Sequence, residues 1–142
     1  MVSNLKIYNN FNLERKDKGS IILIGNFDGL HKGHQKLFNE AKSFKKKYKL
    51  KIGVVTFDPI PKMFFRKLYN YRLSNFNQKI QLLKKNKVDF IINKKFNTKF
   101  SKITCFDFIK KILFKRIGPK YIFVSDNFRF GYKRAGDIKL LK

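Results

Sequence analysis

The two histidines of this chain, His31 and His34, lie three positions apart in a turn that follows an apolar segment. A buried strand over 20–27, followed by a helix from Gly33, would present backbone N–H groups, the positive end of a helix and two imidazoles to one ligand. Imidazole donates a hydrogen bond when neutral and gains charge readily beside phosphate. The types and spacing of these residues therefore predict a site that handles phosphate.

The turn that carries the two histidines also contains three glycines. Gly25 and Gly29 allow positive φ and close approach of the backbone to a ligand, and Gly33 leaves room beside the imidazoles. Two alternatives stay open: the histidines are ordinary surface side chains, or they share a helix face and bind a metal. Both alternatives are weaker, because the only two histidines of the chain rarely fall into one His-x-Gly-His by chance and no other side chain at ligand spacing accompanies them.

The elements that must position this turn follow from the hydrophobic pattern. Apolar segments of strand length alternate with segments of helical period, which is typical of a parallel sheet with right-handed crossovers. We expect one domain with a three-layer α/β fold, because 142 residues with 43% hydrophobic content suit a single core. The expected strands span 20–27, 51–57, 88–92 and 121–125, with an edge strand at 5–8. The expected helices span 33–48, 75–85 and 104–114, with N-caps at Ser74 and Thr104, and another helix begins after Gly136.

Three loops with recognisable motifs follow the first, second and fourth of these strands. The first loop carries the two histidines, the second begins with Asp58 and Pro59, and the third runs from Asn127 to Gly131. In parallel α/β sheets, ligands bind beyond the carboxyl ends of the strands, near the point where the strand order reverses. We therefore expect one pocket to gather all three loops.

These motifs resemble a known family, the N-terminal domain of prokaryotic bifunctional riboflavin kinase/FMN adenylyltransferase, also called FAD synthetase. The runs that carry the resemblance are GNFDGLHKGHQ at 25–35, TFDPIP at 56–61, NFRFG at 127–131 and RAGD at 134–137. The first run indicates the nucleotidylyltransferase superfamily, and the three loops in this order indicate a flavin adenylyltransferase. The resemblance implies that 1–142 is a Rossmann-like FAD synthetase domain.

The resemblance also implies a reaction. The phosphate of FMN would attack the α-phosphorus of ATP in line, giving FAD and pyrophosphate with Mg²⁺ and without a covalent protein intermediate. Such a transfer asks the protein mainly to position and neutralise charge. His31 and His34 would contact the ATP phosphates, and the backbone that approaches the nucleotide would belong to Gly25, Asn26, Phe27, Asp28, Gly29 and Gly33.

The remaining site residues implied by the resemblance lie in the other two loops. Asp58, before Pro59, would help to hold Mg²⁺ or orient the FMN phosphate, although an Asp before a proline also forms turns. Arg129 would pair with a phosphate or with a loop carboxylate. Asn127, Phe128 and Phe130 would line the flavin pocket, with core packing as the alternative for the two phenylalanines.

The chain also departs from the family pattern. Ile60 stands where the family has a histidine, and Ser125 where it has a glycine. The sequence stops at Lys142, before the Ser-Ser/Thr-Thr-x-x-Arg run and the riboflavin kinase domain. We therefore expect a domain that is incomplete at its C-terminus, a sheet edge that favours self-association, and weak nucleotide binding with slow or no FAD synthesis by this chain alone.

Charge and composition limit the classes of partner that the sequence predicts. The formal charge of +25, from 34 Lys and Arg against 9 Asp and Glu, favours polyanions, but the abundance of Lys, Asn, Ile and Phe is also what an AT-rich gene imposes. The aromatic residues fall mostly on expected core faces, which argues against a nucleic-acid-binding protein. The sequence is also compatible with a different His-x-Gly-His nucleotidylyltransferase and with a non-catalytic remnant of such an enzyme.

Cysteine and hydropathy indicate the compartment. Cys105 is the single cysteine, so an intrachain disulfide is excluded, and this fits a reducing cytoplasm. No segment approaches the ~18 consecutive apolar residues that cross a bilayer. We expect a cytoplasmic protein that does not bind membranes.

Overall fold

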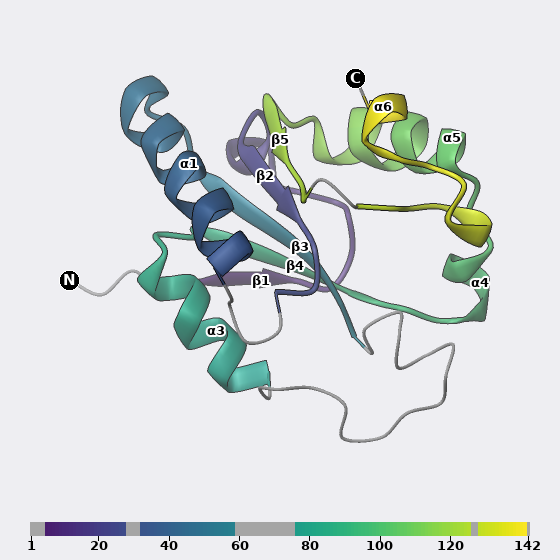
Figure 1. The fold of residues 1–142 in the computed structure, drawn as a ribbon, viewed down its shortest axis with the longest axis horizontal. Coiled ribbons are helices and arrows are strands. Elements are labelled where there is room, and N and C mark those ends of the chain that lie inside the picture. Colours follow the sequence, from purple (N-terminus) through teal and green to yellow (C-terminus); the bar gives the residue numbers. More distant parts are fainter. Residues whose placement is uncertain (1–4, 28–31, 59–75, 126–127, 142) are drawn as a thin grey trace.

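The chain folds around one parallel β-sheet (Figure 1). A computed structural model describes residues 5–27, 32–58, 76–125 and 128–141. The sheet has the strand order β1-β4-β3-β2-β5, and all its pairings are parallel. The strands are β1 (Lys6–Tyr8), β2 (Ile21–Ile24), β3 (Ile52–Asp58), β4 (Phe90–Lys95) and β5 (Tyr121–Phe123).

Helices cover both faces of this sheet, which confirms the predicted three-layer α/β fold (Figure 1). One face is covered by α1 (Lys32–Tyr48) and α3 (Phe76–Lys85). The other carries α4 (Thr98–Ser101), α5 (Cys105–Asp107), the π-helix η2 (Phe108–Ile117) and α6 (Ile138–Leu141). Two 3₁₀ turns complete the described elements, η1 (Arg15–Asp17) and η3 (Tyr132–Arg134). In the described part of the chain, no helix has both the length and the apolar character needed to cross a bilayer.

The core is divided by the sheet into two clusters. Leu23 and Val54 point into the cluster under α1 and α3, whereas Ile22 and Val55 point into the cluster under η2. All four residues of β2 are buried, because this strand lies between β3 and β5 with helices on both faces. A continuous apolar run is the expected sequence of such a strand.

The strand order reverses beside β2. The chain moves from β2 to β3 and then to β4, and it then returns to place β5 on the other side of β2. Crevices at such a reversal are where parallel α/β sheets bind ligands, beyond the carboxyl ends of the strands. The predicted phosphate turn leaves the carboxyl end of β2 and therefore stands at this position.

Several predicted boundaries were wrong, for backbone reasons. The strand expected over 20–27 ends at Ile24, because the chain bends at Gly25 and Phe27 takes a left-handed φ of 49°. The strand expected over 88–92 is Phe90–Lys95, since pairing with the end of β3 satisfies its backbone whatever the side chains are. The strand expected over 121–125 ends at Phe123.

The third predicted helix, 104–114, begins as expected and then changes its winding. Thr104 caps α5, where its Oγ1 accepts a hydrogen bond from the N–H of Asp107 at 3.1 Å. The chain then continues as the π-helix η2 to Ile117, which apolar periodicity alone does not predict. Gly118 ends it in the left-handed conformation, with its N–H bonded to the carbonyl of Leu113 at 2.8 Å. The other predicted cap, Ser74, lies outside the described residues.

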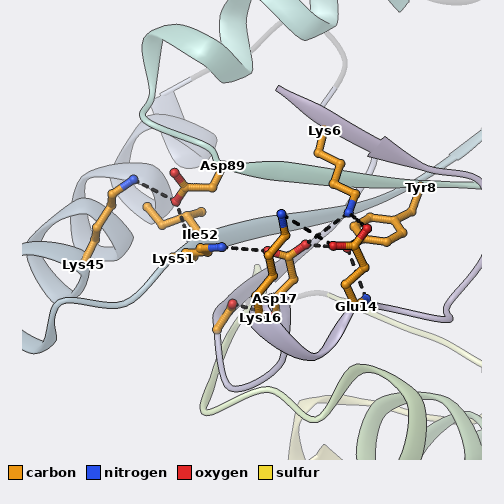
Figure 2. A network of polar contacts seen from close by, with 10 residues as sticks. Lys6, Tyr8, Glu14, Lys16, Asp17, Lys45, Lys51, Ile52 and Asp89 are labelled. Atoms are coloured by element: carbon orange, nitrogen blue, oxygen red, sulfur yellow. Dashed lines mark hydrogen bonds and ion pairs between the residues drawn. The ribbon is translucent and has the colours of Figure 1, made fainter. Parts of the chain in front are cut away.

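A buried carboxylate ties β1 to the amino ends of β2 and β3 (Figure 2). Asp17, 4% exposed, accepts hydrogen bonds from the Tyr8 hydroxyl and from Lys51 Nζ at 3.0 Å, and Lys6 Nζ lies 4.0 Å away. Burial alone would raise the pKa of Asp17, but the hydrogen bonds from Tyr8 and Lys51 and the two positive charges lower it overall. The network joins β1, η1 and the start of β3 through one side chain.

Candidate functional site

The end of the predicted phosphate turn forms the first turn of α1. Helix α1 begins at Lys32, so Gly33 and His34 lie in its first turn, and this turn contains no acidic residue. The first turn of a helix carries the positive end of its dipole. Phe38 and Ala41 are buried against the sheet and hold the helix in place. An anion is therefore favoured at this end of α1.

The ring of Phe27 supports the imidazole of His34. The two ring centroids are 5.0 Å apart and the rings meet edge to face, while Phe38 contacts Phe27 from another side at 5.1 Å. Phe27 holds a left-handed φ of 49°, which is rare for a bulky residue and occurs where the surroundings fix the backbone. The Phe27 ring folds back over Gly25, and a Cβ on Gly25 would lie 3.0 Å from it, so a larger residue there would push the ring by a few tenths of an ångström.

A groove opens beside His34. It has a volume of about 650 Å³ and runs along β5, between α1 and α6. This volume is within the range of about 300–1,000 Å³ that small-molecule sites occupy. Its walls come from α1 (Gly33, His34, Lys36, Leu37, Glu40), from 119–125 and from α6 (Ile138, Leu141). The groove thus joins the phosphate turn after β2 to Ser125, which follows β5.

The end of β3 carries polar groups on the same side of the sheet as α1. The Thr56 hydroxyl donates a hydrogen bond to the carbonyl of Asn26 at 3.3 Å, and it accepts one from Lys79 Nζ at 3.2 Å. Thr56 is fully buried and Lys79 is 3% exposed. Asp58, the last residue of β3, is half-buried, and its carbonyl accepts a hydrogen bond from the N–H of Phe96 at 3.1 Å.

Sequence reasoning missed Lys79. It recognised Ile80 and Leu83 as the inward side chains of this helix, and the structure confirms that Leu83 is buried and that Ile80 packs against the same cluster. Lys79 lies one turn before Leu83 and so shares its inward face. A lysine at that position in an apolar stripe was the available signal.

The loop after β5 packs mainly against the opposite face of the sheet. Phe128 and Phe130 stack with centroids 5.6 Å apart, and Phe130, 7% exposed, belongs to the core cluster under η2. Arg129 forms an ion pair with Asp137 at 3.3 Å, and both side chains are exposed. The structure therefore brings His34 and Ser125 together in the groove, whereas Phe128, Arg129 and Phe130 are not among its lining residues.

Some predicted site residues lie outside the described residues, namely Asp28, Gly29, His31, Pro59 and Asn127. Within the described ranges, no three His, Cys, Asp or Glu side chains come close enough to hold a metal ion together.

Known proteins resemble this chain in sequence and in fold. The family whose model matches residues 13–142 is described as FAD synthetase. The bifunctional riboflavin kinase/FMN adenylyltransferase of Buchnera aphidicola subsp. Acyrthosiphon pisum (strain APS) is 41% identical over 132 residues, which are 92% of this chain and 42% of that protein. The protein with the same description from Escherichia coli (strain K12) is 34% identical over 126 residues, 88% of this chain and 40% of its own length.

Among solved structures, the chain resembles the crystal structure of a macrolide-efflux protein from Streptococcus pneumoniae. The TM-score is 0.78 at 26% sequence identity, and the match covers 95% of this chain and 45% of that chain. This likeness supports the fold. The chain spans less than half the length of the curated relatives described above.

Proposed function

Since this chain belongs to the FAD synthetase family, we propose that it transfers the adenylyl group of ATP to FMN, giving FAD and pyrophosphate. The observation that carries the proposal is the groove along β5, which has His34 and the positive end of α1 in its wall. In a nucleoside triphosphate, the polyphosphate is an anion that the positive end of α1 would attract. Its aromatic base has faces that can pack against the rest of the groove. The groove stands where the strand order reverses, which is the ligand position of this architecture.

In the proposed reaction, an oxygen of the FMN phosphate forms a bond to the α-phosphorus of ATP. The bond between that phosphorus and the oxygen bridging to the β-phosphorus breaks, and pyrophosphate leaves with the electron pair. His34, together with His31, would donate hydrogen bonds to the polyphosphate and stabilise the charge that develops on it. The backbone of the turn from Gly25 to Gly33 would approach the nucleotide closely.

We assign Mg²⁺ and FMN to the ends of β3 and β5. Mg²⁺ prefers oxygen ligands, and the carboxylate of Asp58 at the carboxyl end of β3 is of that kind. Pro59, Asn127 and Phe128 would contact the flavin. Because Phe130 is buried beneath Phe128, its proposed role is to support that ring.

Adenylyl transfer is tested by incubating the chain with MgATP and FMN and separating FAD by chromatography. We expect this chain alone to form FAD slowly, and we expect His34→Ala to reduce that rate further by about 10² to 10³, the loss typical of removing one transition-state hydrogen-bond donor. Lys46→Ala, an exposed change at the far end of α1, is the matched control and leaves the rate unchanged.

Two outcomes would contradict the proposal. One is turnover by His34→Ala at the wild-type rate. The other is that an unrelated acceptor, such as a pantetheine phosphate or a nicotinate nucleotide, is adenylylated in preference to FMN, which would indicate another His-x-Gly-His nucleotidylyltransferase. The predicted cytoplasmic location and self-association stay predictions, tested by cell fractionation and by sedimentation.

A further inference from the structure

Lys79 occupies an exceptional place for a cation in this protein. The chain has 34 Lys and Arg, and of those that the structure describes Lys79 alone is buried, with 3% of its surface exposed. It is the fourth residue of α3, on the face that packs against the sheet. The lysines in the last turn of the same helix, Lys84 and Lys85, are at least partly exposed.

This position is unfavourable for a positive charge in two independent ways. Burial removes the ammonium from water, which disfavours its charged form. In addition, the first turns of a helix carry the positive end of its dipole, so cations are stabilised at the opposite end, where Lys84 and Lys85 lie. Proteins keep charges in such places mainly at functional sites, where stability is exchanged for activity.

A chain of hydrogen bonds leads from Lys79 to the phosphate turn. Lys79 Nζ donates to Thr56 Oγ1 at 3.2 Å, and Thr56 Oγ1 donates to the carbonyl of Asn26 at 3.3 Å. A hydroxyl has one proton, so when it accepts from an ammonium that proton is directed to the next acceptor. Asn26 directly precedes Phe27, whose ring supports the imidazole of His34.

We propose that Lys79 is a positioning residue of the adenylyl-transfer site, which acts through Thr56 to hold the Asn26 carbonyl and thereby fixes Phe27 and His34 in the geometry that receives the ATP phosphates. This inference rests on the proposed function and deepens it. The role requires a donor long enough to reach a buried hydroxyl from α3, and a lysine on the inner face of that helix meets this condition.

The test compares four single variants at Lys79 and Thr56, the double variant Lys79→Met/Thr56→Val, and one control variant on the same helix. Lys79→Met keeps the length of the side chain and removes its charge, whereas Lys79→Arg keeps the charge. Thr56→Val removes the hydroxyl that joins Lys79 to Asn26, and Thr56→Ser retains it. Lys85→Met, an exposed change on the same helix, is the control for loss of one positive charge. Each variant is assayed for kcat and KM with ATP and FMN varied separately, for MgATP affinity by calorimetry, and for its urea midpoint.

We expect Lys79→Met and Thr56→Val each to lower kcat/KM for ATP by about 10- to 100-fold, the scale of an ångström-level misplacement, while KM for FMN stays within about twofold. The double variant should lose no more than either single variant, because both changes break one chain of contacts. Lys79→Arg and Thr56→Ser should recover most of the activity. The urea midpoint should show that Lys79→Met and Thr56→Val are fully folded under the assay conditions, so that a loss of kcat/KM in the folded protein separates a positioning role from a merely structural one.

Three outcomes would overturn the inference: wild-type kinetics for Lys79→Met, losses that add in the double variant, or a loss of activity that follows the unfolded fraction. The affinity for MgATP distinguishes a failure of the Lys79 inference from a failure of the proposed adenylyl transfer. If the wild type binds MgATP but makes no FAD, adenylyl transfer to FMN is refuted, and a weakened MgATP affinity of Lys79→Met still decides the role of Lys79. If the wild type binds no MgATP, both proposals fail.

Discussion

Two buried charges, Asp17 and Lys79, stand at opposite ends of the same sheet and differ in what surrounds them. Asp17 lies at the amino ends of β2 and β3, where a hydroxyl and two ammonium groups face its carboxylate (Figure 2). Lys79 lies near the carboxyl ends, within the positive end of α3, and donates to a hydroxyl that leads into the phosphate turn. The hydrogen bonds and cations around Asp17 favour its charge, whereas burial and the dipole of α3 oppose the charge of Lys79.

The difference follows from the direction of the strands. All strands are parallel and α1 and α3 each follow a strand, so the positive helix ends gather at the carboxyl end of the sheet. The helix dipoles therefore stabilise an anionic ligand at the carboxyl end of the sheet, and they do not stabilise a cation there. At the amino end, the hydroxyl and ammonium groups around Asp17 stabilise its buried charge. Changes at the amino end should therefore affect folding, and changes at the carboxyl end should affect nucleotide binding.

The largest expected effect on stability comes from Asp17. Asp17→Ala should lower the free energy of unfolding by about 3 kcal/mol, because it leaves the buried Tyr8 hydroxyl without its acceptor and removes the charge that Lys51 faces. The MgATP affinity of the folded protein should not change. Urea unfolding and calorimetry measure the two quantities. A loss below about 1 kcal/mol, or a weaker MgATP affinity, would break the comparison between the two ends.

The same carboxylate predicts how stability depends on pH. The pKa of Asp17 is lower in the folded protein than its ordinary value of about 3.9, so its contribution is fully present above that value and is lost as the pH falls through the lower folded pKa. The free energy of unfolding of the wild type should therefore fall more steeply below pH ~4 than that of Asp17→Asn. Parallel curves for the two proteins in acid would show that the carboxylate is not stabilised by its neighbours.

The fold was predictable because its signals are local. The apolar run of β2 and the 3.6-residue period of α1 are visible in the sequence, and both elements form where they were expected. The boundaries were less predictable, since the left-handed φ of Phe27 and the winding of η2 depend on packing against residues distant in sequence. Tertiary context decides such ends.

The candidate site was predictable only in part, for the same reason. His34 stands in a motif that a reader of the sequence recognises at once, and the structure places it in the wall of the groove. The contact of Lys79 with Thr56 joins α3 to β3 across 23 residues of sequence, and no local pattern marks it. Phe130 belongs to a motif as visible as that of His34, yet the structure buries it in the core under η2. A motif shows that a segment is special without showing which of its side chains face the ligand.

The smallest expected effect on stability comes from a substitution of Gly25. It tests whether changes at the carboxyl end of the sheet alter MgATP binding more than folding. In Gly25→Ala, the new Cβ would lie 3.0 Å from the Phe27 ring, so the ring must shift by a few tenths of an ångström. The free energy of unfolding should change by less than about 1 kcal/mol, because the buried ring has to shift by only a few tenths of an ångström. Because the His34 imidazole contacts the Phe27 ring edge to face, it should move with that ring. The dissociation constant for MgATP should therefore rise severalfold.

Gly53→Ala is the matched control, since it also places a methyl group against an aromatic ring, that of Phe90, but in the middle of the sheet. The new Cβ would overlap two fully buried side chains, at 2.3 Å from the Phe90 ring and 2.9 Å from Ile22 Cδ1, so this change should cost about 1–3 kcal/mol of stability. Because Phe90 contacts neither α1 nor the turn that precedes it in the described packing, the MgATP affinity of the folded protein should stay at the wild-type value. If Gly25→Ala instead lost stability while MgATP affinity held, the Phe27 ring would be core packing alone, and the link from Asn26 through Phe27 to His34 would lose its middle step.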